Sequence, residues 1–203
     1  MKKLLRLASI FILALALVCC TTLVKDKKIL REDLIRLHVV GHSDSREDQA
    51  VKLIVKAAVV DYLSSKLNGI QNAQQAKEQL LTLLPRVEAV ANAALWNEGS
   101  THTAAVTLAL EEFDTRVYET FTLPAGVYQS LRISIGEAAG KNWWCVVFPS
   151  LCVPKTSQGF ADKAVSAGMD KGLSDTLSGK QQYQFRFFLL DCVGKIENMF
   201  RKG

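Results

Sequence analysis

The chain has 203 residues, and its 25 basic residues outnumber its 20 acidic residues by five. Residues 1–24 hold three of the basic residues and none of the acidic ones, so the remainder carries 22 basic against 20 acidic residues and is almost neutral. That remainder has no basic run with interleaved aromatic residues, which argues against nucleic acid as a partner. Its length suits one domain with a substantial core.

The first 24 residues have the pattern of a secretory signal, because a basic start precedes an uncharged, mainly apolar run over residues 7–24. The run is close to the roughly 20 residues that a membrane span needs. A cleaved signal peptide and a retained membrane anchor therefore both stay open, and a retained anchor would contact the membrane through this run. Lipidation at Cys20 is a third reading, although the residues before it are not the usual small ones. We expect the charged residues 25–33 to form a tether.

Hydrophobic periodicity predicts helices and strands over the rest of the chain. Ser45, with Asp48 three residues later, resembles a capping box at the start of the first helix. That helix is expected to bury one face, which carries Ala50, Leu53, Ile54, Ala57 and Val60. Pro85 is expected to kink or divide the second helix. The predicted elements are a strand over 34–40, helices over 45–67 and 72–95, strands over 103–110, 115–122, 127–135 and 143–148, a polar loop with a weak helical turn over 155–180, and a helix over 184–200.

These elements predict an α+β fold. We expect a single domain over residues 34–203, with about four strands in a mostly antiparallel sheet. Two long helices are expected to pack on one face of the sheet, and a C-terminal helix closes the chain.

The segment 142–152 is the most unusual stretch, because it contains the adjacent Trp143 and Trp144. Adjacent side chains of a strand point to opposite faces, so one indole can fill the core while the other faces out. An exposed indole beside the apolar turn at Phe148 and Pro149 is typical of a protein–protein hot spot. The alternative, in which both indoles are covered, stays open. We take these four residues as candidate partner contacts, together with the turn at Ser43 and Asp44.

His38, Ser43 and Asp44 are the residue types of a hydrolytic triad, but the chain has no G-x-S-x-G elbow. We therefore expect the Ser43–Asp44 turn to satisfy backbone groups at a strand-to-helix junction. A cysteine hydrolase would need an activated thiolate, whereas Cys145 lies in an apolar strand that raises a thiol pKa.

Three cysteines follow the N-terminal run: Cys145, Cys152 and Cys192. In an exported protein a bridge between Cys145 and Cys152 is possible, with the turn at Pro149 between them, and the unbridged state stays open. Cys192 is then left over. The cysteine spacing is a poor metal-ligand set and no nucleotide or metal motif occurs, so we expect no catalytic, cofactor or metal site.

Three blocks of the sequence, residues 35–53, 123–133 and 136–152, resemble the stage II sporulation protein R family in order and spacing. The chain departs from the family's usual pattern at Gly41, His42 and Ser150. The resemblance implies a non-enzymatic signalling protein, made in the forespore and exported to the space between the forespore and mother-cell membranes. There it would activate a membrane-bound aspartic protease of the mother cell, which processes the precursor of the mother-cell sigma factor. The alternative is a secreted cysteine- or serine-dependent hydrolase.

Overall fold

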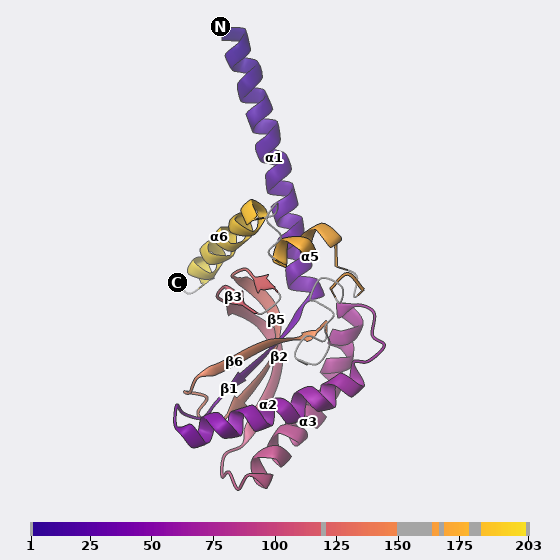
Figure 1. Cartoon of the computed structure of the whole chain (residues 1–203), viewed down its shortest axis with the longest axis vertical. Helices are drawn as coiled ribbons and strands as arrows, with labels where there is room; N and C mark the ends of the chain where they lie inside the picture. The colour runs from indigo at the N-terminus through magenta and orange to yellow at the C-terminus, as the bar shows by residue number, and fades with distance from the viewer. Residues whose placement is uncertain (1, 119–120, 150–163, 167–168, 179–183, 202–203) are drawn as a thin grey trace.

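The computed structural model describes residues 2–118, 121–149, 164–166, 169–178 and 184–201 (Figure 1). The helices are α1 (Lys2–Asp33), α2 (Arg46–Lys66), α3 (Ala73–Asn97), α5 (Lys171–Leu177) and α6 (Gln184–Arg201). The strands are β1 (Ile35–Val40), β2 (Ala104–Phe113), β3 (Arg116–Val117), β4 (Thr122–Leu123), β5 (Gly126–Ile135) and β6 (Asn142–Phe148).

A four-stranded sheet in the order β2-β5-β1-β6 forms the centre of the fold. β5 pairs antiparallel with β2 and parallel with β1, and β6 pairs antiparallel with β1. The sheet is thus mostly antiparallel, and the predicted α+β fold with two long helices and a C-terminal helix is confirmed. The strand expected over 115–122 is instead divided between β3 and β4, which pair with each other in a separate small sheet.

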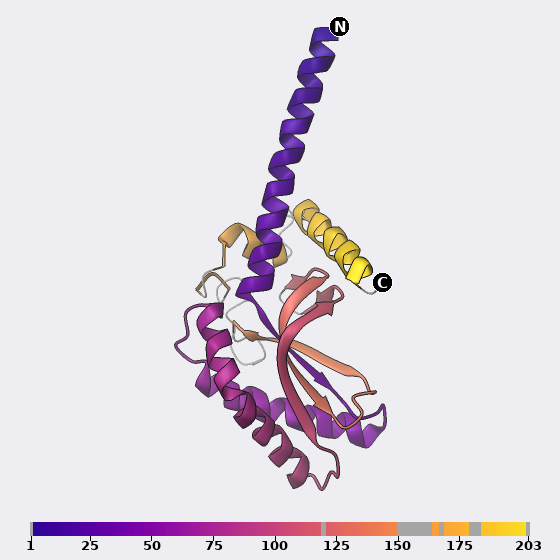
Figure 2. The same cartoon turned by 180° about the vertical axis from the view of Figure 1, so that it is seen from behind.

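Helices α2 and α3 cover one face of the central sheet (Figures 1 and 2). Ser45 caps α2 as expected, since its side chain accepts a hydrogen bond from the Asp48 amide. The buried face of α2 differs from the expected one: it carries Lys52, Val55, Val59 and Leu63. Apolar residues surround most of this helix, so periodicity alone does not select the face that packs on the sheet.

Pro85 lies inside α3, which continues through it as one helix, so of the two expected outcomes the division does not occur. Proline removes the amide that would bond to the carbonyl of Leu81, but Pro85 and Leu81 are both exposed, so water can reach that carbonyl. Leu80 and Val87, on either side of the proline, are buried in the core and hold both halves of the helix on the sheet.

The end of α1, together with α5, α6 and the β3–β4 hairpin, forms a second core on the opposite face. Residues 25–33, where the sequence predicts a tether, continue α1 as helix, with Leu30 buried and Lys27 in an ion pair with Glu197 of α6 at 2.5 Å. The first part of α1 projects away from the rest of the fold (Figures 1 and 2). In the described part of the chain, no helix has the length and apolarity needed to cross a membrane.

Candidate functional site

Two loops meet at the end of the fold away from the projecting part of α1: the β1–α2 loop and the β5–β6 loop (Figures 1 and 2). The amide of Gly140 donates to the carbonyl of Gly41 at 3.0 Å, and that of Ala139 donates to the carbonyl of His42 at 3.1 Å. A Cβ atom on Gly140 would lie only 2.2 Å from the carbonyl oxygen of Ser43. The two loops are therefore fixed against each other as one surface.

Ser43 and Asp44 lie in this surface, but both side chains are engaged within the chain. The Ser43 hydroxyl donates to the Asp48 carboxylate at 2.5 Å, and the Lys141 amide donates to the Asp44 carboxylate at 2.6 Å. The bond from Ser43 is the main cause that lowers the pKa of Asp48. Because its hydroxyl donates to a carboxylate, Ser43 lacks the imidazole base that a triad nucleophile requires.

The structure brings the two predicted contact segments together at the start of β6. Asp44 accepts from the amide of Lys141, and the buried Lys52 donates to the carbonyl of the same residue at 2.8 Å. Burial lowers the pKa of the Lys52 ammonium, while the nearby Asp44 carboxylate acts in the opposite direction. These contacts place the β1–α2 loop beside the chain that leads into Trp143.

Trp143 and Trp144 point to opposite faces of β6, as the alternation of a strand requires. Trp143 is 39% exposed, and the ammonium of Lys56 on α2 lies 4.9 Å from its ring centroid. Trp144 is half-buried, since it stacks on His38 at 5.5 Å and the Arg116 guanidinium lies 3.5 Å from its ring centroid. Of the two indoles, Trp143 is thus the more accessible to a partner.

Phe148 and Pro149 are buried, so their side chains are packed inside the fold rather than presented at the surface. Cys145 is also buried, and it is disulfide-bonded. Cys152, its predicted partner, lies outside the described residues, and Cys192 is a free cysteine. A cysteine held in a disulfide offers no thiolate, so Cys145 has no nucleophile for a hydrolase in this state.

His42, Asp48 and His102 are one group of potential metal ligands among the residues that the structure describes. The rings of His42 and His102 stack with centroids 3.8 Å apart, and His102 Nε2 lies 3.6 Å from Asp48 Oδ1. The Glu137 amide donates to Nδ1 of His42 at 3.0 Å, which places the proton of a neutral ring on Nε2. A metal ion would have to displace the bond to Nδ1 or the proton on Nε2, so the geometry fits a stacked histidine pair, with His42 held by the Glu137 amide, better than a preformed ion site.

A charged network on the sheet face opposite α2 and α3 joins three neighbouring strands. Glu111 of β2 accepts from Arg132 of β5 at 2.8 Å and lies 3.1 Å from Nδ1 of His38 on β1, whose Nε2 is 2.8 Å from the Asn142 side chain. Burial alone would raise the pKa of Glu111, but the hydrogen bonds from His38 and Arg132 outweigh it and lower the pKa to about 2. An open pocket of about 330 Å³ lies beside this network, and its charged walls suit a polar or ionic group.

The Glu111 network predicts a specific acid sensitivity. The Glu111 pKa is lowered on folding from 4.5 to about 2, so its stabilisation is complete above pH 4.5 and is lost as the pH falls towards 2. After allowance for solvent screening, we expect it to contribute about 1–2 kcal/mol. Glu111→Gln should remove this part of the pH dependence, measured as urea unfolding free energies of both proteins between pH 7 and pH 2. An identical acid dependence in parent and variant would contradict the assignment.

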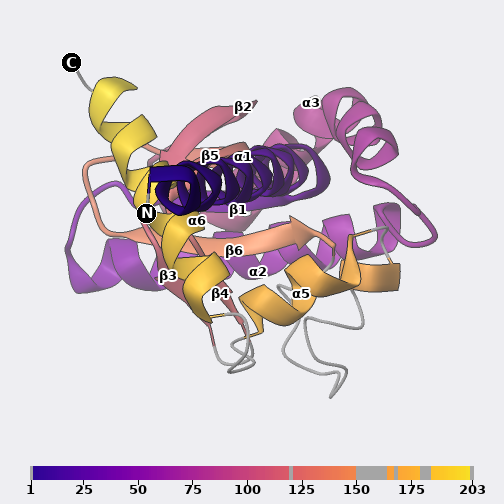
Figure 3. The ribbon, with the colours of Figure 1, turned by 90° about the horizontal axis from the view of Figure 1, so that it is seen from above.

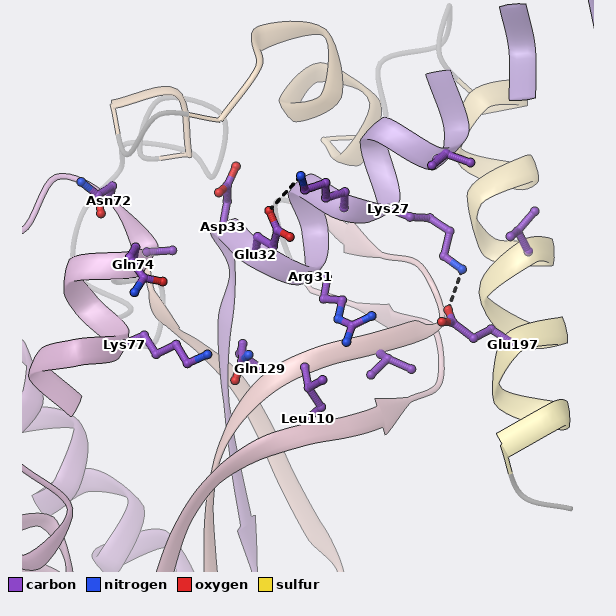
Figure 4. A pocket seen from close by; sticks show the side chains of 15 residues that line it. Lys27, Arg31, Glu32, Asp33, Asn72, Gln74, Lys77, Leu110, Gln129 and Glu197 are labelled. Atoms are coloured by element: carbon purple, nitrogen blue, oxygen red, sulfur yellow. Dashed lines mark hydrogen bonds and ion pairs between the residues drawn. The ribbon is translucent and has the colours of Figure 1, made fainter. Parts of the chain in front are cut away.

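A larger open pocket of about 1030 Å³ lies between the end of α1, the start of α3, the β2 and β5 strands and α6 (Figure 4). Two ion pairs lie at its wall, Lys27 with Glu197 and Lys28 with Glu32 at 3.9 Å. Its lining combines both signs of charge with amide side chains. The pocket could accommodate a polar segment, but its mixed charge selects no particular ligand.

Sequence reasoning missed Glu111 and Arg132 as members of a site. Each lies in a predicted strand, but only the pairing of β2, β5 and β1 brings them beside His38. It also passed over Trp96, at the end of α3, whose side chain is 81% exposed.

Comparison with known proteins identifies the family. The sequence model of Stage II sporulation protein R matches residues 31–158, which is more than half of the chain. The chain belongs to the stage II sporulation protein R family. It is 32% identical over 135 residues to the Stage II sporulation protein R of Bacillus subtilis (strain 168), an alignment that covers 66% of this chain and 60% of that protein. No solved structure matches the chain.

The stage II sporulation protein R match contains both the loop surface and the charged network. It begins near the end of α1 and extends past β6, so Ser43, Glu111 and Trp143 all lie within it. Helices α5 and α6 lie beyond the matched residues. The family assignment supports a role in sporulation, and it leaves the function of α6 to be argued from the structure.

Proposed function

We propose that this protein is an exported signal of sporulation that activates a membrane-bound aspartic protease. It is made in the forespore and acts in the space between the forespore and mother-cell membranes. The activated protease of the mother cell then removes the pro-sequence of the mother-cell sigma factor. Membership of the stage II sporulation protein R family supports this proposal. The proposal also rests on the distance between the apolar part of α1 and the loop surface around Trp143, which lie at opposite ends of the fold (Figures 1 and 2).

The N-terminal helix supports export. Residues 7–24 carry no charge, and the side chains of Leu7, Phe11 and Val24 are exposed along the projecting part of α1. Exposed apolar surface of this extent indicates contact with a membrane or with the export machinery. Residues 1–24 then serve as a signal peptide or as a membrane anchor.

The loop surface around Trp143 is the proposed contact with the protease. The loops that form it lie at the end of the fold away from the projecting helix (Figures 1 and 2). A protein attached to one membrane through residues 7–24 would therefore present Trp143 and Asp44 towards the opposite membrane. This arrangement suits a protein that is exported from the forespore and contacts a protease in the mother-cell membrane.

A non-catalytic role agrees with the contacts of Ser43 and Cys145, the nucleophiles that the alternative hydrolase would need. Ser43 donates to Asp48 instead of a histidine, and Cys145 is disulfide-bonded. Neither residue has the activated state that the alternative hydrolase requires. Activation by binding needs only a fixed surface with an accessible anchor residue, which Trp143 supplies.

The test of this proposal is Trp143→Ala. Because truncation of a hot-spot tryptophan costs about 2 kcal/mol or more, we expect the concentration needed for half-maximal protease activation to rise by roughly thirtyfold. The readout is the cleaved fraction of the sigma-factor precursor in cells that express the protease, compared at equal amounts of exported protein. Leu81→Ala on α3, another exposed apolar side chain, is the matched control and should leave activation unchanged. Unchanged activation by a folded, exported Trp143→Ala protein would exclude this contact surface.

A further inference from the structure

Helix α6 packs on the fold through the apolar Phe187 and Leu190, which belong to the second core, and through several polar contacts. The Asp191 carboxylate accepts from the Ala125 amide at 2.8 Å, and Asn198 donates to the Phe113 carbonyl at 3.0 Å. Gly194 lies between these two on the same face, and a Cβ atom there would approach the Ala125 oxygen to 1.7 Å. These contacts fix the rotation of α6 about its own axis.

The outward face of α6 is consequently apolar. Phe188 is 60% exposed and Phe200 is 84% exposed, and Ile196 and Met199 lie on the same side of the helix at three- and four-residue spacings. The half-buried Leu189, Cys192 and Val193 extend this face, which contains no charged residue. A surface helix of a globular protein normally turns such a face towards the core, so its outward position in α6 requires an apolar partner.

The position of α6 indicates which partner this is. Seen from above, α6 lies across the fold on the side from which α1 projects (Figures 1 and 3). The two helices are joined by the ion pair between Lys27 and Glu197, only three residues after the uncharged run of α1 ends at Val24. A membrane that receives residues 7–24 would therefore lie next to α6.

Charged residues border this apolar surface. Lys25 is exposed just after the apolar run of α1. Lys28, Lys195 and Arg201 are exposed near the same side, each in an ion pair with an acidic side chain of this chain. Basic residues beside an apolar face are the pattern of helices that lie in the interface of an anionic bilayer. Hydrophobic and electrostatic attraction would then act on the same side of the molecule.

We propose that α6 is an interfacial membrane helix, which inserts the side chains of Phe188, Ile196, Met199 and Phe200 into the surface of the bilayer that residues 7–24 are proposed to contact. This inference rests on the proposed membrane contact of residues 7–24 and adds a second point of attachment. Two attachments fix the orientation of the domain relative to the membrane. The loop surface around Trp143 is thereby held facing away from that bilayer.

Phe200→Trp in the full chain tests this inference. The native tryptophans are Trp96, Trp143 and Trp144, and none lies in α1 or α6. The protein is mixed with vesicles of phosphatidylcholine, or of phosphatidylcholine and phosphatidylglycerol, whose acyl chains carry bromine, which quenches nearby indoles. Flotation of the vesicles measures attachment of the whole chain, and loss of tryptophan emission measures the depth of residue 200.

We expect the Phe200→Trp protein to float and to be quenched, more strongly with phosphatidylglycerol, while the parent protein floats and keeps its emission. Adding Phe188→Asp should lower the docked fraction of α6 about tenfold or more, because burying one phenylalanine is worth at least that factor. Leu81→Asp in the same background is the matched control and should keep the quenching.

Flotation without quenching of the Phe200→Trp protein would overturn the interfacial helix and leave the membrane contact of α1 intact. If the protein shows no flotation and no quenching, both the interfacial helix α6 and the membrane contact of α1 are wrong. A blue shift in the emission of the introduced indole without vesicles, accompanied by dimers in sedimentation, would assign the apolar face to a second copy of the chain instead. Each result therefore separates the failure of α6 from the failure of α1.

Discussion

Gly194→Ala is expected to destabilise the protein, although alanine is the better helix former. In a helix interior where side chains have room, this exchange stabilises by about 1 kcal/mol. Here the new Cβ atom would lie 1.7 Å from the carbonyl oxygen of Ala125 and 2.4 Å from its carbon, both in the backbone. Backbone atoms cannot yield as a flexible side chain can, so α6 must move away from the turn before β5.

The displacement would break the polar contacts that hold α6. Asp191 would lose the Ala125 amide, and its bond with Thr115 would be strained, because both partners lie outside α6. We expect a net loss of about 2 kcal/mol or more in the free energy of unfolding, since overpacking alone typically costs about 1–3 kcal/mol. Chemical denaturation measures this loss, and limited proteolysis should show earlier cleavage near α6.

Ile196→Ala is the matched control in the same helix. Ile196 is exposed two residues further on, so its truncation should change the unfolding free energy by no more than about 0.5 kcal/mol. An increase in stability for Gly194→Ala would show that α6 does not pack closely against Ala125. It would also remove the argument that the apolar face of α6 is held outwards.

The ends of the helices were predictable because their signals are local. The side-chain oxygens of Ser45 and Asn72 each accept a hydrogen bond from the backbone N–H three residues later. For Ser45 the sequence pattern and the structure describe the same contact. The C-terminal helix was also located from its periodicity. Its outward apolar face was not, because that depends on the fit of Gly194 to Ala125, which is distant in sequence.

The residues of the candidate sites were less predictable for the same reason. Trp143 and Trp144 could be assigned to opposite faces of a strand from alternation alone, and the structure places them so. Which indole stays accessible depends on His38 and Arg116, which cover Trp144 from other strands. The Glu111 network likewise requires the pairing of β5 with both β1 and β2, and no local pattern specifies this register.

Arg36 is a buried cation that lacks a carboxylate partner among its described contacts. Its side chain is 0% exposed, and only Nη2 has a hydrogen-bond partner, the Tyr118 hydroxyl at 2.9 Å. The guanidinium lies 3.8 Å from the ring centroid of Phe113 and 5.1 Å from that of Tyr128. Burial lowers the pKa of Arg36, and the neighbouring Tyr118 and Tyr128 offset this only in part.

Arg36→Met is therefore expected to leave the protein equally stable or more stable, by up to about 3 kcal/mol. The effective penalty for burying a charge is several kcal/mol, and each unsatisfied buried nitrogen adds about 1–3 kcal/mol. The contacts with the aromatic rings and the hydrogen bond to Tyr118 each stabilise the buried guanidinium by about 2 kcal/mol. Methionine fills similar space without the charge, whereas Arg36→Ala leaves a cavity and should cost about 2–5 kcal/mol.

Urea unfolding of the parent, Arg36→Met and Arg36→Ala proteins measures whether each substitution raises or lowers the free energy of unfolding. A loss above about 1 kcal/mol in Arg36→Met would show that the aromatic contacts outweigh desolvation. If Arg36→Met is stable yet fails in the proposed activation of the protease, the charge serves that proposed activity rather than the fold.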